Sequence, residues 1–392
     1  MSLTATPPTA LADQVIAWLG TQQAAMEALL QEIVNIDSGS RQAAGVDQVA
    51  AVIGAHLERA GLSVQTQVFE GYGRCLQARL PAAPGGPTDA GHVLLLGHMD
   101  TVFPAGTASA RPYRVEGHKA FGPGVADMKS GLVLNTFVLE ALARVGGASR
   151  PVHLFFSCDE EIGSPVTRDA IRQAAQGAQV VLNAEPGRIT GNVVTARKGS
   201  CLTVFEVQGV AAHAGINPAQ GASAIEALAH KILALHALNG CEEGVTLNVG
   251  HIEGGMAANV VAPLAKAQLD LRYTAATDLD ALLKRVREII EAESLPRTQG
   301  RILSQHSTLP MAPTPPALLA CYQRHATRLG FQVEGEFTGG AADSGITSSM
   351  GIPTLCALGP VGGYAHSERE FCQIDTLVPR AQALALTILD PA

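Results

Sequence analysis

Two hydrophobic patterns alternate along the first half of the chain. Apolar residues with helical spacing cover residues 10–36, 45–60, 128–145 and 166–175. Between them lie short apolar runs typical of strands, at residues 63–69, 75–80, 92–97 and 180–183, and in the first half of residues 152–162. Strands that alternate with helices predict an α/β domain with a mainly parallel sheet covered by helices on both faces.

The pattern changes after residue 196. Strands are predicted at residues 201–208, 245–251, 267–273 and 301–304, with helices at 222–238 and 278–292. The order β-α-β-β-α-β is that of a ferredoxin-like unit. Within it, Leu269, Leu271 and Tyr273 alternate with polar residues, which indicates a sheet with one open face.

A proline-rich segment at residues 310–316 returns the chain to the α/β pattern. Helices at residues 317–329 and 377–389 follow, with strands at 331–336 and 353–358. We therefore predict one α/β domain formed by residues 1–196 and 309–392, interrupted by an inserted α+β domain at residues 197–308.

Composition narrows the class of protein. The 392 residues are 47% hydrophobic and 16% charged, which is typical of a folded core. The net charge of −8, without a basic tract, argues against nucleic acid as a partner. No apolar run approaches the roughly 18 residues of a membrane span, and the N-terminus lacks a signal-peptide pattern. Seven scattered cysteines indicate neither a disulfide framework nor a cysteine-type zinc site, so we expect a reducing cytoplasm.

Three consecutive acids, Asp159, Glu160 and Glu161, follow the apolar run that begins at Val152. The carboxyl end of a buried parallel strand faces the crevice where α/β proteins bind ligands. Adjacent carboxylates repel one another unless they share a proton or a cation. Neighbouring residues point in different directions, so one glutamate could bind a metal while the other moves a proton. The alternative is a solvated acidic turn.

Four further motifs carry metal-binding side chains: His98-Met99-Asp100, Asp127 in a glycine-rich bend, Glu185 and His366. Each has an ordinary alternative, such as a helix N-cap for Asp127 or a surface histidine for His366. Together with Glu161, they supply two histidines and three carboxylates. If one carboxylate bridges, this set holds two ions roughly 3.5–4 Å apart. Nitrogen and oxygen ligands suit Zn²⁺, and also Mn²⁺ or Co²⁺.

The ordered motifs resemble one family across nearly the whole chain. They are L-L-L-G-H-M-D-T-V, G-P-G-V-A-D-M-K-S-G, D-E-E-I-G-S, A-E-P, A-H-A-G, A-N-V-V and G-G-Y-A-H-S-E. The set is similar to that of the di-zinc peptidases and deacylases, which include bacterial glutamate carboxypeptidase, aminoacylase, acetylornithine deacetylase and succinyl-diaminopimelate desuccinylase. The glutamate carboxypeptidase branch is the most similar, through H-M-D-T-V, T-G-G-A-A-D-S-G and L-G-P-V-G-G-Y-A-H-S-E.

The resemblance implies a zinc-exopeptidase-like fold with two Zn²⁺ per subunit. By it, His98 and Glu185 would bind one ion, Glu161 and His366 would bind the other, and Asp127 would bridge them. A cis peptide bond that does not involve proline often follows the bridging acid in this family, here between Asp127 and Met128.

Other roles follow from the same resemblance. Asp100 would orient His98, and Glu160 would be the general base, in agreement with the proton-moving role that the acidic run suggests. The inserted domain resembles a lid and dimerisation domain, and the chain would be a homodimer. In that domain His213 would polarise the scissile carbonyl, in its own site or in the partner subunit's. Asn259 and Arg272 would hold the substrate and its free carboxylate. Without the resemblance, Arg272 is an ordinary charge on a strand surface.

These residues predict a hydrolase that cleaves an acyl-amino acid or a short peptide and releases a C-terminal amino acid, with glutamate or aspartate favoured. The sequence departs from the pattern of this family at two places that bear on the side chain of the released amino acid. Residues 301–310 lack a further arginine before Pro310, and Ala341-Ala342 stands where relatives tend to have a glycine and a small polar residue. An N-acyl amino acid deacylase is the alternative enzyme. An inactive conjugate-binding protein and an acidic interaction scaffold are the alternatives without activity.

Overall fold

The computed structural model describes residues 8–85 and 91–390. The chain forms two compact units. The first comprises Met1–Ala196, Ala312–Thr338 and Ala342–Ala392, and the second comprises Arg197–Met311 and Gly339–Ala341. The insertion thus ends at Met311, three residues later than predicted, and the short segment 339–341 joins it. Residues 1–7, part of the N-terminus in which we expect no signal peptide, lie outside the described residues.

A six-stranded sheet lies at the centre of the first unit, in the order β1-β2-β6-β3-β7-β14. The strands are β1 (Ser63–Phe69), β2 (Gly73–Leu80), β3 (His92–His98), β6 (Val152–Ser157), β7 (Ala178–Asn183) and β14 (Thr354–Leu355). The last four in sheet order are parallel, whereas β1 and β2 form an antiparallel edge. Every residue of β3 is buried, as its unbroken apolar run predicts.

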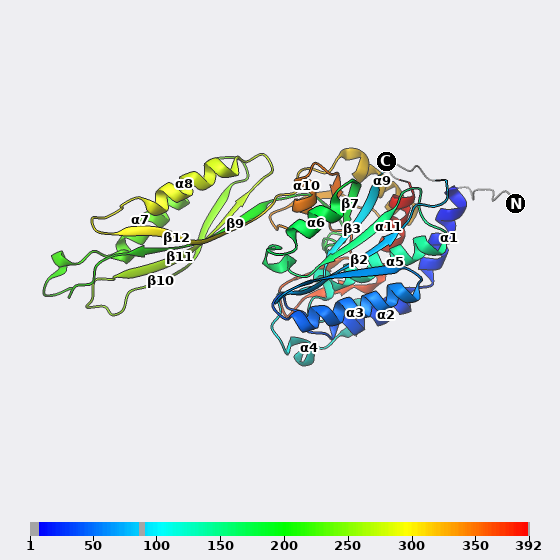
Figure 1. The fold of residues 1–392 in the computed structure, drawn as a ribbon, viewed down its shortest axis with the longest axis horizontal. Helices are drawn as coiled ribbons and strands as arrows, with labels where there is room; N and C mark the ends of the chain where they lie inside the picture. Colours follow the sequence, from blue (N-terminus) through cyan, green and yellow to red (C-terminus); the bar gives the residue numbers. More distant parts are fainter. Residues whose placement is uncertain (1–7, 86–90, 391–392) are drawn as a thin grey trace. The chain divides into compact units, whose positions relative to one another are not determined.

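Helices cover both faces of this sheet (Figure 1). One face carries α3 (Ala43–Arg59) and α5 (Ser130–Arg144), and α1 (Pro8–Gly20), α2 (Gln23–Val34) and α11 (Leu377–Leu389) pack against α5. The helix α9 (Pro316–Arg328) packs against α11. The other face carries α6 (Arg168–Ala175) and α10 (Ser344–Ser348). This arrangement confirms the predicted α/β class.

Several boundaries differ from the prediction. The single helix expected over residues 10–36 is two helices, because the chain turns at Thr21 and Gln22 between α1 and α2. The strand expected at residues 331–336 is displaced to β13 (Gly335–Thr338), which pairs with β8 (Val193–Arg197).

A small sheet that the sequence did not predict has the order β15-β16-β5-β4. Its strands are β4 (Arg114–Glu116), β5 (Lys119–Phe121), β15 (Gly362–Gly363) and β16 (Phe371–Gln373). The pairing of β16 with β5 places the loop that carries His366 beside the glycine-rich bend that carries Asp127. These two segments are far apart in the sequence.

The second unit has the predicted β-α-β-β-α-β order. Its elements are β9 (Gly199–Gln208), α7 (Ala224–His236), β10 (Thr246–Gly254), β11 (Leu264–Tyr273), α8 (Leu279–Glu291) and β12 (Gln299–Thr308). The antiparallel sheet has the order β10-β11-β9-β12. Leu269, Leu271 and Tyr273 face its core, as their alternation predicts. Ser223 and Asp278 cap α7 and α8 by accepting hydrogen bonds from backbone N–H groups.

Among the helices of the described residues, none combines the length and the apolar character that a bilayer crossing requires.

Candidate active site

His98 is the last residue of β3, and its ring is held by Asp100. The His98 Nδ1 atom lies 3.0 Å from the Asp100 carbonyl oxygen and 3.4 Å from Oδ1. The Asp100 carboxylate also accepts hydrogen bonds from Ser40 Oγ at 2.6 Å and from the backbone N–H groups of Glu160 and Glu161 at 3.0 and 3.1 Å. Asp100 therefore fixes the ring and the acidic turn together, and Nε2 of His98 faces the other acids.

Asp127 lies between the two histidines. Its Oδ1 atom is 3.3 Å from His98 Nε2, and its Oδ2 atom is 3.3 Å from His366 Nε2. The Asp127–Met128 peptide bond is cis, as the resemblance implies. The N-cap alternative for Asp127 is wrong, because α5 begins at Ser130 and its N-cap residue is Lys129. One carboxylate thus presents its two oxygens to two imidazoles, which is the arrangement required of a bridging ligand.

The remaining acids lie on either side of Asp127. Glu161 Oε2 is 3.0 Å from His366 Nε2, whereas Glu185 Oε1 is 3.8 Å from His98 Nε2. Glu160 Oε2 also lies 3.8 Å from His98 Nε2. The structure thus brings together all six side chains that the sequence assigned to the metals and to the general base.

The donor set fits metal ions. The Glu161 Oε1 atom is buried and has no hydrogen-bond partner within the described residues. A buried carboxylate oxygen without a partner is unfavourable, and a cation at this position would satisfy it. Two imidazoles and three carboxylates without a thiolate match Zn²⁺, Mn²⁺ or Co²⁺.

Protons occupy these ligands in the metal-free chain. Hydrogen bonds to Asp127 and Glu161 raise the pKa of His366 to about 10. Burial opposes the charge on His98, but its contacts with Asp100 and Asp127 raise its pKa well above the ordinary value. Burial, followed by the charge of Asp127, raises the pKa of Glu161 to about 7. In the absence of metal, these contacts therefore favour the protonated form of both histidines.

Metal binding should accordingly release protons. An imidazole must be neutral to ligate, and the pKa of His366 of about 10 lies above its ordinary value. The cationic form is thus favoured below that pKa, and it competes less as the pH rises. We expect the apparent affinity of the metal-free protein for Zn²⁺ to increase from about pH 6 to pH 9. Calorimetry in two buffers of different ionisation enthalpy would count the protons, and an affinity that does not change with pH would contradict the assignment.

Three other acids near the site, Glu370, Asp159 and Asp343, are hydrogen-bonded to backbone N–H groups or hydroxyl groups and not to the two histidines. Glu370 is buried and accepts hydrogen bonds from the N–H groups of Gly124, Ala126 and Asp127 at 3.3, 2.9 and 3.0 Å. It therefore fixes the bend that carries the bridging acid. Asp159 accepts hydrogen bonds from Thr167 Oγ1 and from the backbone N–H groups of Val166 and Thr167.

Asp343 accepts hydrogen bonds from Ser157 Oγ at 2.7 Å and from Ser164 Oγ. It thereby joins the start of α10 to the end of β6. The sequence alone indicates no role for Glu370 or Asp343. Two sequence features could have indicated these acids: Glu370 lies four residues after His366, and Asp343 is the aspartate of T-G-G-A-A-D-S-G.

The three remaining candidates lie in the second unit. A backbone bridge pairs His213 with Val260, and the Asn259 carbonyl accepts a hydrogen bond from the N–H of Ala214. The A-H-A-G and A-N-V-V motifs are therefore adjacent. Arg272 lies on β11, where it forms an ion pair with Asp270 at 3.0 Å and donates to the Gly339 carbonyl at 3.3 Å.

Together, the α/β fold, the inserted α+β unit and the paired histidine–carboxylate centres define a metallohydrolase. The model of peptidase family M20/M25/M40 matches residues 94–390, and the chain belongs to this family. The family that the motifs suggested is thereby confirmed, and the chain is an enzyme of the metallopeptidase and amidohydrolase type.

Named relatives agree with this assignment. Carboxypeptidase G2 from Pseudomonas sp. (strain RS-16) is 28% identical over 387 residues, which cover 94% of this chain and 90% of the relative. An acetylornithine deacetylase from Vibrio cholerae is 29% identical over 254 residues, 61% of this chain and 64% of the relative. Among solved structures, a dinuclear metal-binding peptidase of family M20 from Bacillus subtilis has the same fold, with a TM-score of 0.68, 15% identity, and coverage of 94% and 97%.

Proposed function

We propose that this protein is a di-zinc hydrolase that cleaves an amide bond and releases an amino acid with a free α-carboxylate, glutamate or aspartate. The observation that carries the proposal is the position of Asp127, whose two oxygens each lie 3.3 Å from a different imidazole. The similarity to carboxypeptidase G2 over nearly the whole chain supports release of a C-terminal residue.

Each ligand has a proposed place. His98 and Glu185 hold one ion, His366 and Glu161 hold the second, and Asp127 joins them. When bound, such ions polarise a carbonyl and lower the pKa of a bound water. Mn²⁺ or Co²⁺ could replace Zn²⁺.

Glu160 is proposed as the general base. Its backbone is fixed by Asp100, and its carboxylate lies 3.8 Å from His98 Nε2, farther than the Asp127 oxygen. Glu185 lies at the same 3.8 Å from His98 Nε2, so the resemblance to the family, and not the distance, assigns proton transfer to Glu160. In this role Glu160 takes a proton from the attacking water. It can then deliver that proton to the leaving amine.

The second unit is proposed as the lid and dimerisation domain. His213 would stabilise the oxyanion, and Asn259 would hold the substrate. The edge strand β10 and the residues after it expose apolar side chains, with Ile252 60% and Met256 78% exposed. Exposed apolar residues on an edge strand favour a protein contact. Light scattering that finds only monomers at assay concentration would exclude action of His213 across subunits.

The acyl half of the substrate has a candidate place in the first unit. A recess of about 570 Å³ lies beside His366 and is lined by residues that include Phe103, Pro104 and Arg111. This volume is in the range of small-molecule sites, so an aromatic acyl group would fit. A reducing cytoplasm is the proposed location, because the seven cysteines are free thiols in the described structure.

A substrate panel tests the function. The zinc-reconstituted enzyme would be assayed on benzoyl, acetyl and indoleacetyl conjugates of Glu, Asp, Ala and Arg, with an EDTA control. Chelator-sensitive release of Glu or Asp, largely independent of the acyl group, supports the proposal. The second candidate is an N-acyl amino acid deacylase, which the similarity to acetylornithine deacetylase favours. Activity governed by the acyl group would select it, and inactivity on every conjugate would contradict both.

Arg272 provides a sharper test of substrate binding. We propose that it pairs with the free α-carboxylate, since arginine binds carboxylates through two parallel hydrogen bonds. Removing a hydrogen bond to a charged group costs roughly 1.5–3 kcal/mol, so Arg272→Ala should raise KM by about 10–100-fold. Arg272→Lys should recover part of the loss. Arg272→Ala should have little effect on the KM of a substrate whose α-carboxylate is replaced by a carboxamide. An equal rise in KM for the carboxylate and the carboxamide substrates would contradict this role.

A further inference from the structure

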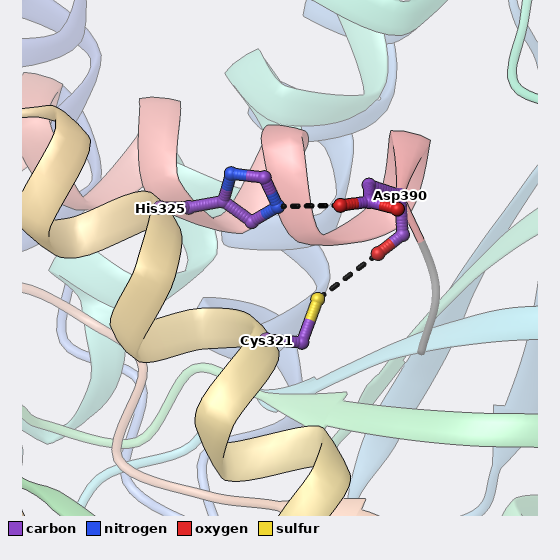
Figure 2. A group of neighbouring side chains, drawn as sticks. All are labelled: Cys321, His325 and Asp390. Carbon is purple, nitrogen blue, oxygen red and sulfur yellow. Dashed lines mark hydrogen bonds and ion pairs between the residues drawn. The ribbon is translucent and has the colours of Figure 1, made fainter.

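A second cluster of metal-binding side chains lies where α9 meets the end of α11 (Figure 2). Cys321 and His325 are one turn apart on α9, so they share a face of the helix. Asp390 is the C-cap residue of α11. The Sγ atom of Cys321 lies 2.9 Å from the Asp390 carbonyl oxygen, and His325 Nε2 lies 3.5 Å from Asp390 Oδ2.

The geometry of this cluster suits one ion. A sulfur, an imidazole nitrogen and a carboxylate oxygen lie within 4.8 Å of one another. Cys321 is fully buried and His325 is 8% exposed, whereas the Asp390 side chain is 61% exposed. Two ligands are therefore fixed in the packed interior of the first unit, and the third is reached from solvent.

The surroundings of the cluster leave the imidazole available. The His325 Nε2 atom is buried and has no hydrogen-bond partner within the described residues. A buried polar atom without a partner is unfavourable, and an ion at this position would satisfy it. Arg324 donates to Asp390 Oδ2 at 3.1 Å. This is the same oxygen that lies 3.5 Å from His325 Nε2. A carboxylate oxygen has two lone pairs, and a ligating carboxylate commonly keeps a hydrogen bond, so the contact with Arg324 leaves a lone pair for an ion.

We propose that Cys321, His325 and Asp390 form a third metal site, separate from the active site, that binds a borderline-soft divalent cation such as Zn²⁺. Water would complete a tetrahedral coordination, and the thiol proton would leave to solvent on binding. The thiolate distinguishes this site from the nitrogen and oxygen ligands of the active site. It should accept Zn²⁺ or Cd²⁺ and exclude Mn²⁺ and Mg²⁺.

The consequence would be structural. The ion joins α9 to the C-terminal end of α11, and α11 packs along α5 in the interior of the first unit. Cys321 and Asp390 are 69 residues apart in sequence, and the chain between them includes His366. A ligand that binds only the folded state stabilises it, so the third ion should raise the unfolding temperature without entering the reaction.

The experiment uses the full chain with Cys241→Ser, which removes the exposed cysteine as a competing thiol. Metal-stripped protein is titrated with Cd²⁺, and both bound metal per chain and the ultraviolet thiolate-to-metal charge-transfer band are measured. We expect three bound ions and a charge-transfer band for this protein. Cys321→Ser and Asp390→Asn should each lose one ion, and Cys321→Ser should also lose the band. Both variants should keep the same kcat.

Controls separate this site from the active site. Cys356→Ser removes another buried thiol of the first unit and should retain the band. His98→Ala should lower the metal count but keep the band. Zinc beyond two equivalents should raise the unfolding temperature of the parent protein and not that of Asp390→Asn. Saturation at two ions in the parent protein, or a band that persists in Cys321→Ser, would overturn the proposal.

Discussion

Glutamine in place of Glu160 is expected to lower kcat by about 10²–10⁴-fold and to leave both active-site metals bound. The amide keeps the shape of the side chain but cannot accept a proton. The backbone N–H of Glu160 still donates to Asp100 in the variant, so the turn that also positions Glu161 is retained. The loss should therefore appear in turnover and not in metal content.

Steady-state kinetics and metal analysis on the same preparation would test this expectation. Asp159→Asn is the matched control, because Asp159 belongs to the same acidic run but holds the turn at Thr167. It should lower stability and leave kcat per folded molecule nearly unchanged. A Glu160→Gln enzyme near the wild-type rate would exclude the proton-transfer role, and one that lost metal would make Glu160 a ligand instead.

The site residues that the sequence located best are those at the ends of long apolar strands. His98 ends β3, and Glu161 and Glu185 follow β6 and β7. Three parallel neighbours necessarily bring their carboxyl ends to one edge. His366 has no such strand before it, because β15 is two residues long. The assignment of His366 as a ligand rested on the resemblance to a family. Its contact with Asp127 depends on the small sheet β15-β16-β5-β4, whose strands are too short to give a periodic pattern in the sequence.

The missed residues share a physical cause. Glu370 and Asp343 are partnered by backbone N–H groups and hydroxyls that are distant along the chain. Such partners leave no pattern in the sequence near the acid itself. A buried carboxylate with several donors is recognised only when the chain has folded around it.

Errors in the element boundaries have local explanations. Gly330 adopts a φ of 88° and closes α9, and Phe331 donates to the Ala326 carbonyl. This C-terminal cap uses Phe331, the first residue of the strand that the apolar pattern predicted, so β13 begins later, at Gly335. The second unit was predicted more closely because its strands are long and alternate regularly.

Alanine in place of Asp127 is expected to remove both active-site metals together and to abolish activity. Asp127 is paired with both histidines, whereas Glu161 is paired with His366 and Glu185 with His98. Loss of a bridging ligand should weaken binding of both ions by more than the about 10–100-fold typical of outer-shell changes. The remaining acids and imidazoles would hold two separate, incomplete centres.

Equilibrium dialysis against buffered Zn²⁺ would show whether the two ions are lost together. Glu185→Gln and Glu161→Gln are the matched variants, and each should weaken one ion and largely spare the other. Glu370→Gln should act more weakly on both, because it changes only the support of the bend at Asp127. If Asp127→Ala retained one ion at wild-type affinity, the carboxylate would be a terminal ligand of the other ion. The two-metal arrangement would then require a different bridge.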